Sequence, residues 1–254
     1  MAHYVLVVGA SGGIGTAVCR AYAERASTAR VVAISRTGLD FDHPKVRALS
    51  CDHQPGSIRA LVEAHPAWFR QLTRVVICNG QLHSDDFQPE KRIEQLDSEA
   101  MMMLFQINTV TPMLYLKALL PCLPPDNTFR REKLAASLHS QPRIVVTVLS
   151  ARVGSITDNR AGGWYSYRAS KAALNMALKT AAIEWWRRNS AVKLLAFHPG
   201  TTNTPLSQPY QSRVPPAKLF STDFVAQKLI AQMDRALPDG ALSFVDWAGC
   251  DIDW

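Results

Sequence analysis

The sequence predicts a single Rossmann-type, doubly wound α/β domain, with a mostly parallel sheet of about seven strands and helices on both faces. Short apolar runs alternate with segments of helical period along the whole 254-residue chain. Continuous apolar runs are typical of strands buried on both faces, and parallel strands need helical crossovers. No repeat or linker divides the chain, and 47% apolar residues suffice for a large core. We therefore expect one domain over residues 1–254.

Strands and helices are predicted in alternation. Six apolar runs predict strands, at residues 4–9, 30–35, 46–51, 74–78, 143–149 and 192–197. Helical spacing of apolar residues predicts helices at 14–24, 58–68 and 222–235. The apolar stretch 100–123 also predicts a buried helix. Polar residues and Pro112 interrupt it before it reaches the roughly 18 residues of a membrane span.

Composition argues against several classes of protein. The five cysteines form no CxxC motif, which favours free thiols in a reducing, cytoplasmic compartment. The seven histidines form no HxxxH or HExxH pair, so we expect no metal site. The 28 basic and 21 acidic residues leave a net charge of +7. No basic-aromatic cluster accompanies that charge, so we expect no nucleic-acid partner. No apolar run reaches the length of a membrane span, so we expect no membrane partner either. A positive field would attract an anionic cofactor.

A glycine-rich turn, GASGGIG at residues 9–15, joins the first predicted strand to the first predicted helix. Gly9 permits a tight turn, Gly13 lets the backbone approach a pyrophosphate, and Gly15 allows close helix–strand packing. The helix N-terminus beyond it offers unpaired N–H groups and a partial positive charge to an anion. The alternative is a glycine-rich surface turn. The strand–turn–helix context favours a dinucleotide site.

The end of the second strand bears on which dinucleotide binds. A site for NAD usually has an acidic residue here for the ribose 2′-hydroxyl, whereas this chain has Ser35 and Arg36. A guanidinium beside a small hydroxyl suits a 2′-phosphate. The sequence therefore predicts NADP(H) as the cofactor, the alternative being that Arg36 is an ordinary solvated arginine.

The segment Tyr167-Arg168-Ala169-Ser170-Lys171 places a phenol and an ammonium four residues apart in a strongly helical stretch. Both side chains then fall on one face, about one turn apart. A neighbouring cation lowers the pKa of a tyrosine from about 10 towards the working pH, so that it can exchange a proton in a carbonyl/alcohol interconversion. The alternative is a Tyr–Lys pair on an exposed helix face.

Several motifs together resemble the short-chain dehydrogenase/reductase family over nearly the whole chain. They are GASGGIG at 9–15, Asp52, Cys78-Asn79-Gly80, Asn108, YRASK at 167–171 and HPGTTNT at 198–204. Within the family, SARVGSI at 150–156, GGWYSYRASKAALNM at 162–176 and the terminal FVDWAGCDIDW are most similar to the sniffer and C-factor branch of carbonyl reductases.

The resemblance implies a role for each matching residue. Tyr167 would protonate the substrate oxygen, Lys171 would contact the nicotinamide ribose and sustain the acidity of Tyr167, and Asn108 would anchor a water route through its backbone. The implied cofactor contacts of Asp52, Asn79 and Thr204 are with adenine, the adenine ribose and the nicotinamide carboxamide. The full expected cofactor set is Gly9, Ser11, Gly13, Ile14, Gly15, Ser35, Arg36, Asp52, Asn79, Gly80, Tyr167, Lys171, Pro199, Gly200, Thr202 and Thr204.

Three positions depart from the family pattern, the first being Val8, where the family usually has a threonine before the first glycine. The usual NNAG is shortened at 78–80, which leaves the assignment of Asn79 open by one place. Counting back three residues from Gly154, the position of the family's serine holds Ala151, with Ser150 one step earlier. A shift of one residue in a strand turns a side chain to the other face, so Ser150 serves only if the strand has ended or bulged there. Ser155 is the second substitute.

We therefore expect an oxidoreductase that transfers a hydride between NADPH and an aldehyde, ketone or quinone. The alternative is a dinucleotide-binding regulatory or signalling protein with weak or no catalysis, which the alanine at 151 favours. The segment after Thr204 is expected to close over the substrate, with Leu206, Tyr210 and Trp164 as apolar walls. Related enzymes commonly pair helices across a two-fold axis, so we expect a homo-oligomer, either a dimer or a tetramer.

Overall fold

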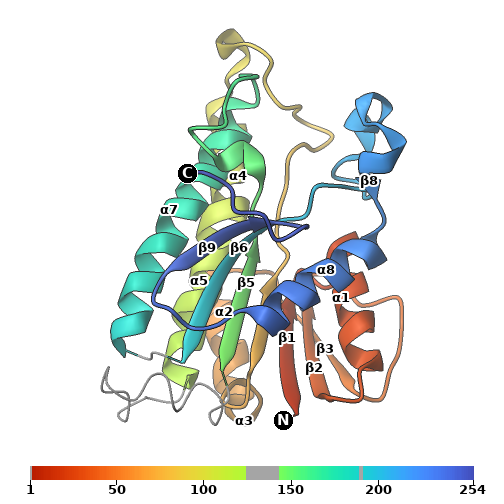
Figure 1. Ribbon diagram of the computed structural model, residues 1–254, viewed down its shortest axis with the longest axis vertical. Coiled ribbons are helices and arrows are strands. Elements are labelled where there is room, and N and C mark those ends of the chain that lie inside the picture. The colour runs from red at the N-terminus through yellow and green to blue at the C-terminus, as the bar shows by residue number, and fades with distance from the viewer. Residues whose placement is uncertain (1, 124–142, 189–190) are drawn as a thin grey trace.

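The computed structural model describes residues 2–123, 143–188 and 191–254, and it confirms the predicted fold class (Figure 1). Seven strands form one sheet in the order β3-β2-β1-β4-β5-β6-β9, and every neighbouring pair is parallel. Each of the six predicted strands is present. The strands are β1 (His3–Val8), β2 (Thr28–Ser35), β3 (Val46–Ser50), β4 (Arg74–Ile77), β5 (Ile144–Leu149), β6 (Val192–His198) and β9 (Leu242–Asp246).

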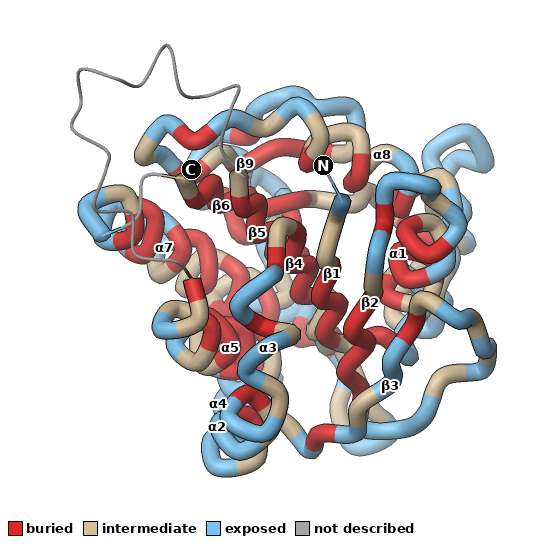
Figure 2. The backbone as a smooth tube through the Cα atoms, turned by 90° about the horizontal axis from the view of Figure 1, so that it is seen from below, coloured by how far each residue is buried: buried red, intermediate tan, exposed pale blue. Residues whose placement is uncertain are grey.

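Helices cover both faces of the sheet (Figure 2). One face carries α1 (Gly13–Glu24) and α8 (Thr222–Arg235); the other carries α2 (Pro55–Ala64), α5 (Thr111–Leu119) and α7 (Tyr165–Arg188). In β1, Leu6 and Val8 belong to the core beneath α2, α5 and α7, whereas Val5 and Val7 belong to the core beneath α1 and α8. Since successive side chains of a strand point to opposite faces, a run of apolar residues supplies both cores at once.

The predicted helix at 58–68 is in fact two helices. The first, α2, ends at Ala64, and α3 (Pro66–Phe69) begins after His65. The ring of a proline pushes the preceding residue out of the helical region, and His65 has φ −129° and ψ 48°.

The predicted helix at 100–123 is also interrupted. Helix α4 (Ser98–Phe105) runs into a π-helical turn, η2 (Gln106–Val110), before α5 and a short 3₁₀ turn, η3 (Leu120–Cys122). Pro112 has no N–H to donate to the carbonyl of Asn108, four residues earlier, so the α-helical pattern cannot continue there. Asn108 therefore lies in a widened turn of the kind that is frequent at functional sites.

The carboxyl ends of the strands carry the loops that form the candidate site. The loop after β6 contains a two-residue strand, β7 (Thr201–Thr202), which pairs with β8 (Leu219–Phe220) and closes the base of the segment between them. Among the residues that the structure describes, no helix is both long and apolar enough to cross a bilayer.

Candidate active site

A groove of two adjoining cavities follows the carboxyl ends of the strands. The Tyr167 cavity has a volume of about 590 Å³ and the Arg36 cavity about 660 Å³. Ser11, Asn79 and Leu82 are among the residues that line both. The groove crosses the boundary between β1 and β4, where the strand order reverses, and ligands of such sheets bind at this switch point.

The glycine turn lies where the two cavities meet. Gly9 has φ +76°, and a Cβ there would lie 3.2 Å from the Asn79 nitrogen. A Cβ on Gly15 would lie 2.2 Å from the Gly9 carbonyl oxygen, which no side chain can accommodate. Gly13, Ile14 and Ser11 line the Tyr167 cavity at the start of α1. The turn therefore presents bare backbone and the N-terminus of a helix to the groove, as a pyrophosphate site requires.

The far end of the groove brings together Ser35, Arg36 and Asp52, together with His53. Arg36 is exposed, and the Ser35 hydroxyl donates to the Thr37 carbonyl. Asp52 accepts the Gln54 N–H at 2.9 Å, and this bond holds the pKa of the carboxyl below its ordinary value. The positive charge of Arg36 thus faces the groove where the sequence predicts a 2′-phosphate.

His53 is a groove residue that the sequence analysis missed. It has φ +65°, unusual for a residue with a side chain, and its Nδ1 lies 2.7 Å from the Tyr115 hydroxyl. Burial, and then the charge of Arg36, lower the pKa of His53. Its position directly after Asp52 was the only available signal.

The groove has the features that a dinucleotide needs. The Oδ1 atom of Asn79 is buried and has no hydrogen-bond partner among the described residues, so an acceptor at the rim of both cavities is left for a ligand. Gly80 lies beside it, and the glycine turn leaves room for phosphates. The residues present therefore fit NADP(H).

Helix α7 brings Tyr167 and Lys171 to the floor of the Tyr167 cavity. Both side chains are buried, and the Lys171 ammonium lies 5.9 Å from the centre of the Tyr167 ring. Lys171 Nζ donates to the Leu149 carbonyl at 2.9 Å. The predicted one-face arrangement is therefore present in the cavity, at the end of β5.

Burial changes the pKa values of this pair. It lowers the pKa of Lys171 to about 8 and raises the pKa of Tyr167 well above its ordinary value of 10. The structure therefore contradicts the lowering of the Tyr167 pKa that the spacing predicts. Desolvation of the buried phenolate causes this rise.

Asn108 connects the loop after β4 to α7. Its Oδ1 accepts the Gln81 N–H at 2.8 Å, and its Nδ2 donates to the Gln81 carbonyl at 2.9 Å and to the Ser170 hydroxyl at 3.0 Å. The side chain is fully buried and not among the groove-lining residues, so it holds the wall of the groove in place.

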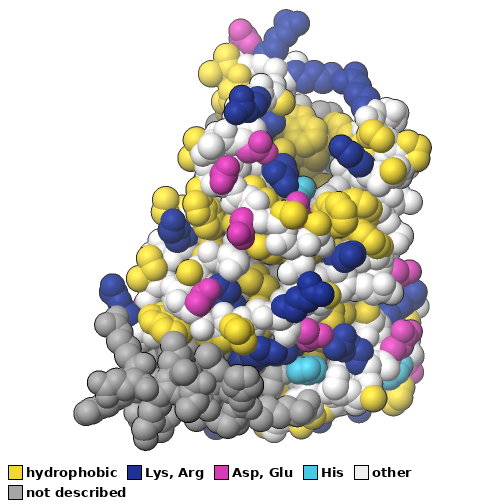
Figure 3. Space-filling view, viewed as in Figure 1, with side chains coloured by type: hydrophobic (Ala, Val, Ile, Leu, Met, Phe, Trp, Pro, Cys, Tyr) yellow, Lys and Arg dark blue, Asp and Glu magenta, His cyan; other side chains and the backbone are white. Residues whose placement is uncertain are grey.

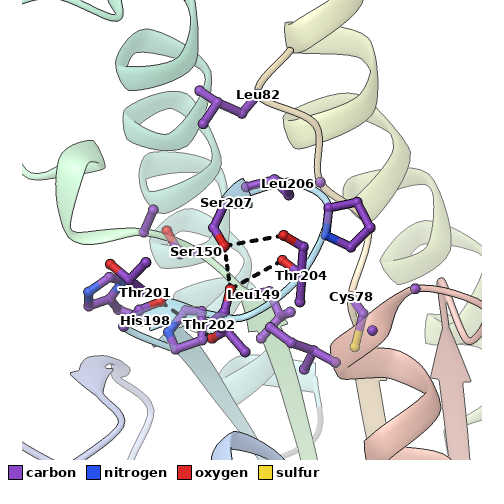
Figure 4. A pocket seen from close by; sticks show the side chains of 18 of the residues that line it. Cys78, Leu82, Leu149, Ser150, His198, Thr201, Thr202, Thr204, Leu206 and Ser207 are labelled. Carbon is purple, nitrogen blue, oxygen red and sulfur yellow. Dashed lines mark hydrogen bonds between the residues drawn. The ribbon is translucent and has the colours of Figure 1, made fainter. Parts of the chain in front are cut away.

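Ser150 follows the last residue of β5, Leu149, so the strand has ended where the serine position requires it. Ser150 lines the Tyr167 cavity (Figure 4), and its hydroxyl donates to Asn175 Oδ1 at 2.6 Å. Ala151 also lines the cavity. Ser155 does not: it is buried, and its hydroxyl accepts the Asp158 N–H at 3.0 Å.

The loop after β6 forms the remaining wall of the Tyr167 cavity, through Pro199, Gly200, Thr202 and Thr204. The Ser207 hydroxyl donates to the Thr202 carbonyl at 2.5 Å, and Thr204 Oγ1 donates to the same oxygen at 3.3 Å (Figure 4). Ser207, which the sequence analysis did not single out, therefore fixes this turn.

Apolar side chains close the outer part of the Tyr167 cavity. Trp164 lies with its ring centre 5.1 Å from that of Tyr210 and 6.2 Å from that of Tyr167. Leu206 packs in the same cluster. The three predicted walls thus surround Tyr167. No group of three His, Cys, Asp or Glu side chains suited to a metal ion occurs within the described residues.

The pKa of His198, at the end of β6, predicts how the free energy of unfolding changes in acid. Burial, and then the charge of Arg152, lower the pKa of His198 to about 4. An unfolded histidine titrates near 6.5, so between about pH 6.5 and 4 the unfolded chain binds a proton that the folded protein refuses. Stability is therefore lost as the pH falls. We expect the free energy of unfolding, measured with urea, to decrease between pH 7.5 and 5 by about 2 kcal/mol more than in the His198→Gln protein. An equal decrease in both proteins contradicts this assignment.

Comparison with known proteins identifies the family of the chain. A family model described as short chain dehydrogenase matches residues 3–214. The C-signal protein of Myxococcus xanthus is 30% identical over 159 residues, which are 63% of this chain and 81% of that protein.

Two solved structures share the fold over 100% of both chains. They are the carbonyl reductase Sniffer of D. melanogaster, with a TM-score of 0.78 and 21% identity, and the NADPH-bound carbonyl reductase from chicken fatty liver, with a TM-score of 0.78 and 20% identity. Identities this low establish likeness of fold alone, but the family model spans most of the chain. The chain therefore belongs to the short-chain dehydrogenase/reductase family, and it is similar to the Sniffer and C-signal proteins.

Proposed function

We propose that the protein is an NADPH-dependent reductase of carbonyl compounds: aldehydes, ketones or quinones. The observation that carries the proposal is the buried Tyr167–Lys171 pair in a cavity continuous with the glycine turn. A proton donor and a dinucleotide site in one groove suit hydride transfer coupled to protonation of an oxygen. The NADPH bound to the chicken carbonyl reductase supports the choice of cofactor.

Residues along the groove would hold the cofactor in order. The turn at 9–15 and the N-terminus of α1 bind the pyrophosphate, with Ser11 and Ile14 at the turn. Ser35 and Arg36 bind the 2′-phosphate, Asp52 the adenine, and Asn79 with Gly80 the adenine ribose. The nicotinamide half contacts Pro199, Gly200, Thr202 and Thr204. When bound, the reduced nicotinamide supplies the hydride for the carbonyl carbon.

Tyr167 is the proposed proton donor. Because burial raises its pKa, the phenol keeps its proton at neutral pH and is in the right form to protonate a carbonyl oxygen as that oxygen gains charge. Lys171 keeps its ammonium at pH 7 and binds the nicotinamide ribose. Pro112 has no N–H to donate to the Asn108 carbonyl, so that carbonyl oxygen would be available to a water molecule. Through such a water Tyr167 would recover its proton.

Ser150 and Asn175 would polarise the substrate carbonyl together. Ser150 donates its only proton to Asn175 Oδ1, while Asn175 Nδ2 is buried without a partner among the described residues. If the amide turns by half a rotation, Nδ2 donates to the Ser150 oxygen and the hydroxyl proton is free for the substrate oxygen. Asn175 is then a positioning residue, one helical turn beyond Lys171.

Replacement of Ser150 tests this role. We expect Ser150→Ala to lower the turnover number roughly 10²–10³-fold, as loss of a hydrogen bond to a developing oxyanion does. NADPH affinity, measured by calorimetry, stays unchanged. Ser155→Ala removes the other candidate hydroxyl and serves as the control. A larger loss in Ser155→Ala than in Ser150→Ala contradicts the assignment.

Oxidation of NADPH in the presence of a panel of aldehydes, ketones and quinones tests the function as a whole. Turnover with at least one class supports the proposal. Tight NADPH binding without turnover on any carbonyl supports the alternative, a dinucleotide-binding regulatory protein, to which similarity to C-signal lends weight.

The compartment, the class of partner and the oligomeric state of the protein are also proposals. The five free cysteines favour a reducing compartment such as the cytoplasm. Figure 3 shows basic side chains interspersed with acidic ones on the face it displays, which favours a small-molecule partner over nucleic acid.

Met176 and Ile183 lie on one face of α7 and are 67% and 46% exposed. These exposed apolar side chains favour association of copies into a dimer or tetramer, and light scattering measures the oligomeric state.

A further inference from the structure

Glu90 is a buried carboxylate that the proposed mechanism does not use. Its exposure is 5%, and it lies in the loop between β4 and α4. Its two carboxylate oxygens accept from the same residue: Oε2 from the Ser166 N–H at 3.3 Å and Oε1 from the Ser166 hydroxyl. Ser166 is in the first turn of α7, where the helix dipole favours a negative charge.

The backbone of Glu90 holds the residue just before this helix. The Trp164 N–H donates to the Glu90 carbonyl at 2.5 Å. Trp164 has φ +54° and follows two glycines that also have positive φ, Gly162 and Gly163. A left-handed backbone is costly for a tryptophan and persists only where its surroundings impose it. The backbone carbonyl of Glu90 thus holds Trp164, and its carboxylate holds Ser166, two residues further along the chain.

The same loop is tied to the segment that closes the Tyr167 cavity. Tyr210 donates its hydroxyl proton to Gln88 Oε1 at 3.3 Å, and His83 Nε2 lies 3.1 Å from the Leu206 carbonyl. The rings of Trp164 and Tyr210, tilted by 58° to each other, therefore stand as a fixed pair at the mouth of the cavity that contains Tyr167.

We propose that Trp164 and Tyr210 form a binding subsite for a flat aryl group of the substrate, and that Glu90 is the positioning residue that holds Trp164 in it. The proposal rests on the proposed carbonyl reductase function. Two aromatic walls beside the proton donor interact with the face and edges of a substrate ring, whereas a saturated ring of the same size gains burial alone. The subsite therefore selects carbonyl compounds that carry an aromatic ring close to the reacting carbon.

A matched pair of ketones tests the subsite. In 1-phenylpropan-2-one and 1-cyclohexylpropan-2-one a methylene separates the ring from the carbonyl, so the two carbonyls have similar intrinsic reactivity. We expect kcat/KM to favour the phenyl compound about tenfold in the wild-type protein, and this ratio to fall about fivefold in Trp164→Leu.

The role of Glu90 is tested by a double-mutant cycle on the same ratio. In Glu90→Gln one amide oxygen faces two Ser166 donors, so we expect the phenyl preference to fall severalfold. The Glu90→Gln/Trp164→Leu protein should lose no more preference than Trp164→Leu alone, because Glu90 acts through Trp164. Ser166→Ala, which removes one of the two bonds, provides a second variant if Glu90→Gln folds poorly.

Asp239→Asn is the matched control. Asp239 binds the buried Lys193 at 2.7 Å at the start of β6, the end of the strand away from the groove, so its loss should lower stability and leave the ratio unchanged. No aryl preference in the wild-type protein, an unchanged ratio in both Glu90→Gln and Ser166→Ala, or additive losses in the cycle overturns the proposal.

Binding of two unreactive mimics separates this inference from the proposed function. The carbonyls of 2-phenylacetamide and 2-cyclohexylacetamide resist reduction by a nicotinamide, and calorimetry measures their binding to NADP⁺-loaded protein. Preference for the phenyl amide without turnover of any ketone means that the subsite stands and the reductase function fails. Turnover of both ketones without preference for the phenyl amide means the reverse.

Discussion

The Tyr167→Phe protein is expected to reduce carbonyl compounds roughly 10²–10⁴-fold more slowly than the wild type, with little change in its affinity for NADPH. The substitution removes one oxygen from a side chain that lies buried in the Tyr167 cavity, and it leaves the ring that contacts Trp164 and Lys171 in place. Single-turnover measurements with preloaded NADPH isolate the chemical step, and calorimetry measures the dissociation constant of the cofactor.

Tyr165→Phe is the matched control for this substitution. Tyr165 begins α7, is 38% exposed and lines neither cavity, so the same loss of a hydroxyl there should leave turnover unchanged. Wild-type turnover in Tyr167→Phe would mean that another group delivers the proton. A large loss of NADPH affinity in the same protein would mean that the hydroxyl acts in cofactor binding.

The fold could be predicted from the sequence because the central strands, such as β4 and β5, are buried on both faces, whereas the edge strand β3 is largely exposed. A run such as Val5 to Val8 supplies two cores at once, and such a run permits few other structures. Helix interruptions were harder to predict. Pro66 and Pro112 are visible in the sequence, but whether a proline ends a helix, kinks it or widens one turn depends on the packing around it.

The site was predictable where its residues form local motifs. The glycine turn and the Tyr167–Lys171 pair depend on spacing along one turn or one helix face, and the structure brings them into one groove. His53, Asn175 and Glu90 could not be found in this way, because their partners lie on other elements: Tyr115, Ser150 and Ser166. Sequence spacing also gave the wrong direction for the pKa of Tyr167, since it reveals a neighbouring charge and says nothing of desolvation.

The Arg36→Asp protein is expected to exchange its preference for NADPH for a preference for NADH. Arg36 is an exposed side chain in the lining of the Arg36 cavity, beside Ser35 at the end of β2. Loss of a charge-assisted contact with a 2′-phosphate removes about 1.5–3 kcal/mol, and a carboxylate in its place repels the phosphate and accepts from a free 2′-hydroxyl. The ratio of kcat/KM for NADPH to that for NADH should therefore fall by roughly 10²-fold or more.

Arg188→Asp makes the same change in net charge at the far end of α7, where the guanidinium is 58% exposed and pairs with Glu184. Its effect on the cofactor ratio measures the long-range field alone, which added salt screens. If Arg36→Asp shifts the ratio no more than Arg188→Asp does, Arg36 is an ordinary solvated arginine, and the 2′-phosphate is not recognised at the end of β2. If the shift is confined to Arg36→Asp and persists at high salt, the guanidinium contacts the phosphate directly, and Arg36 is required for the preference for NADPH.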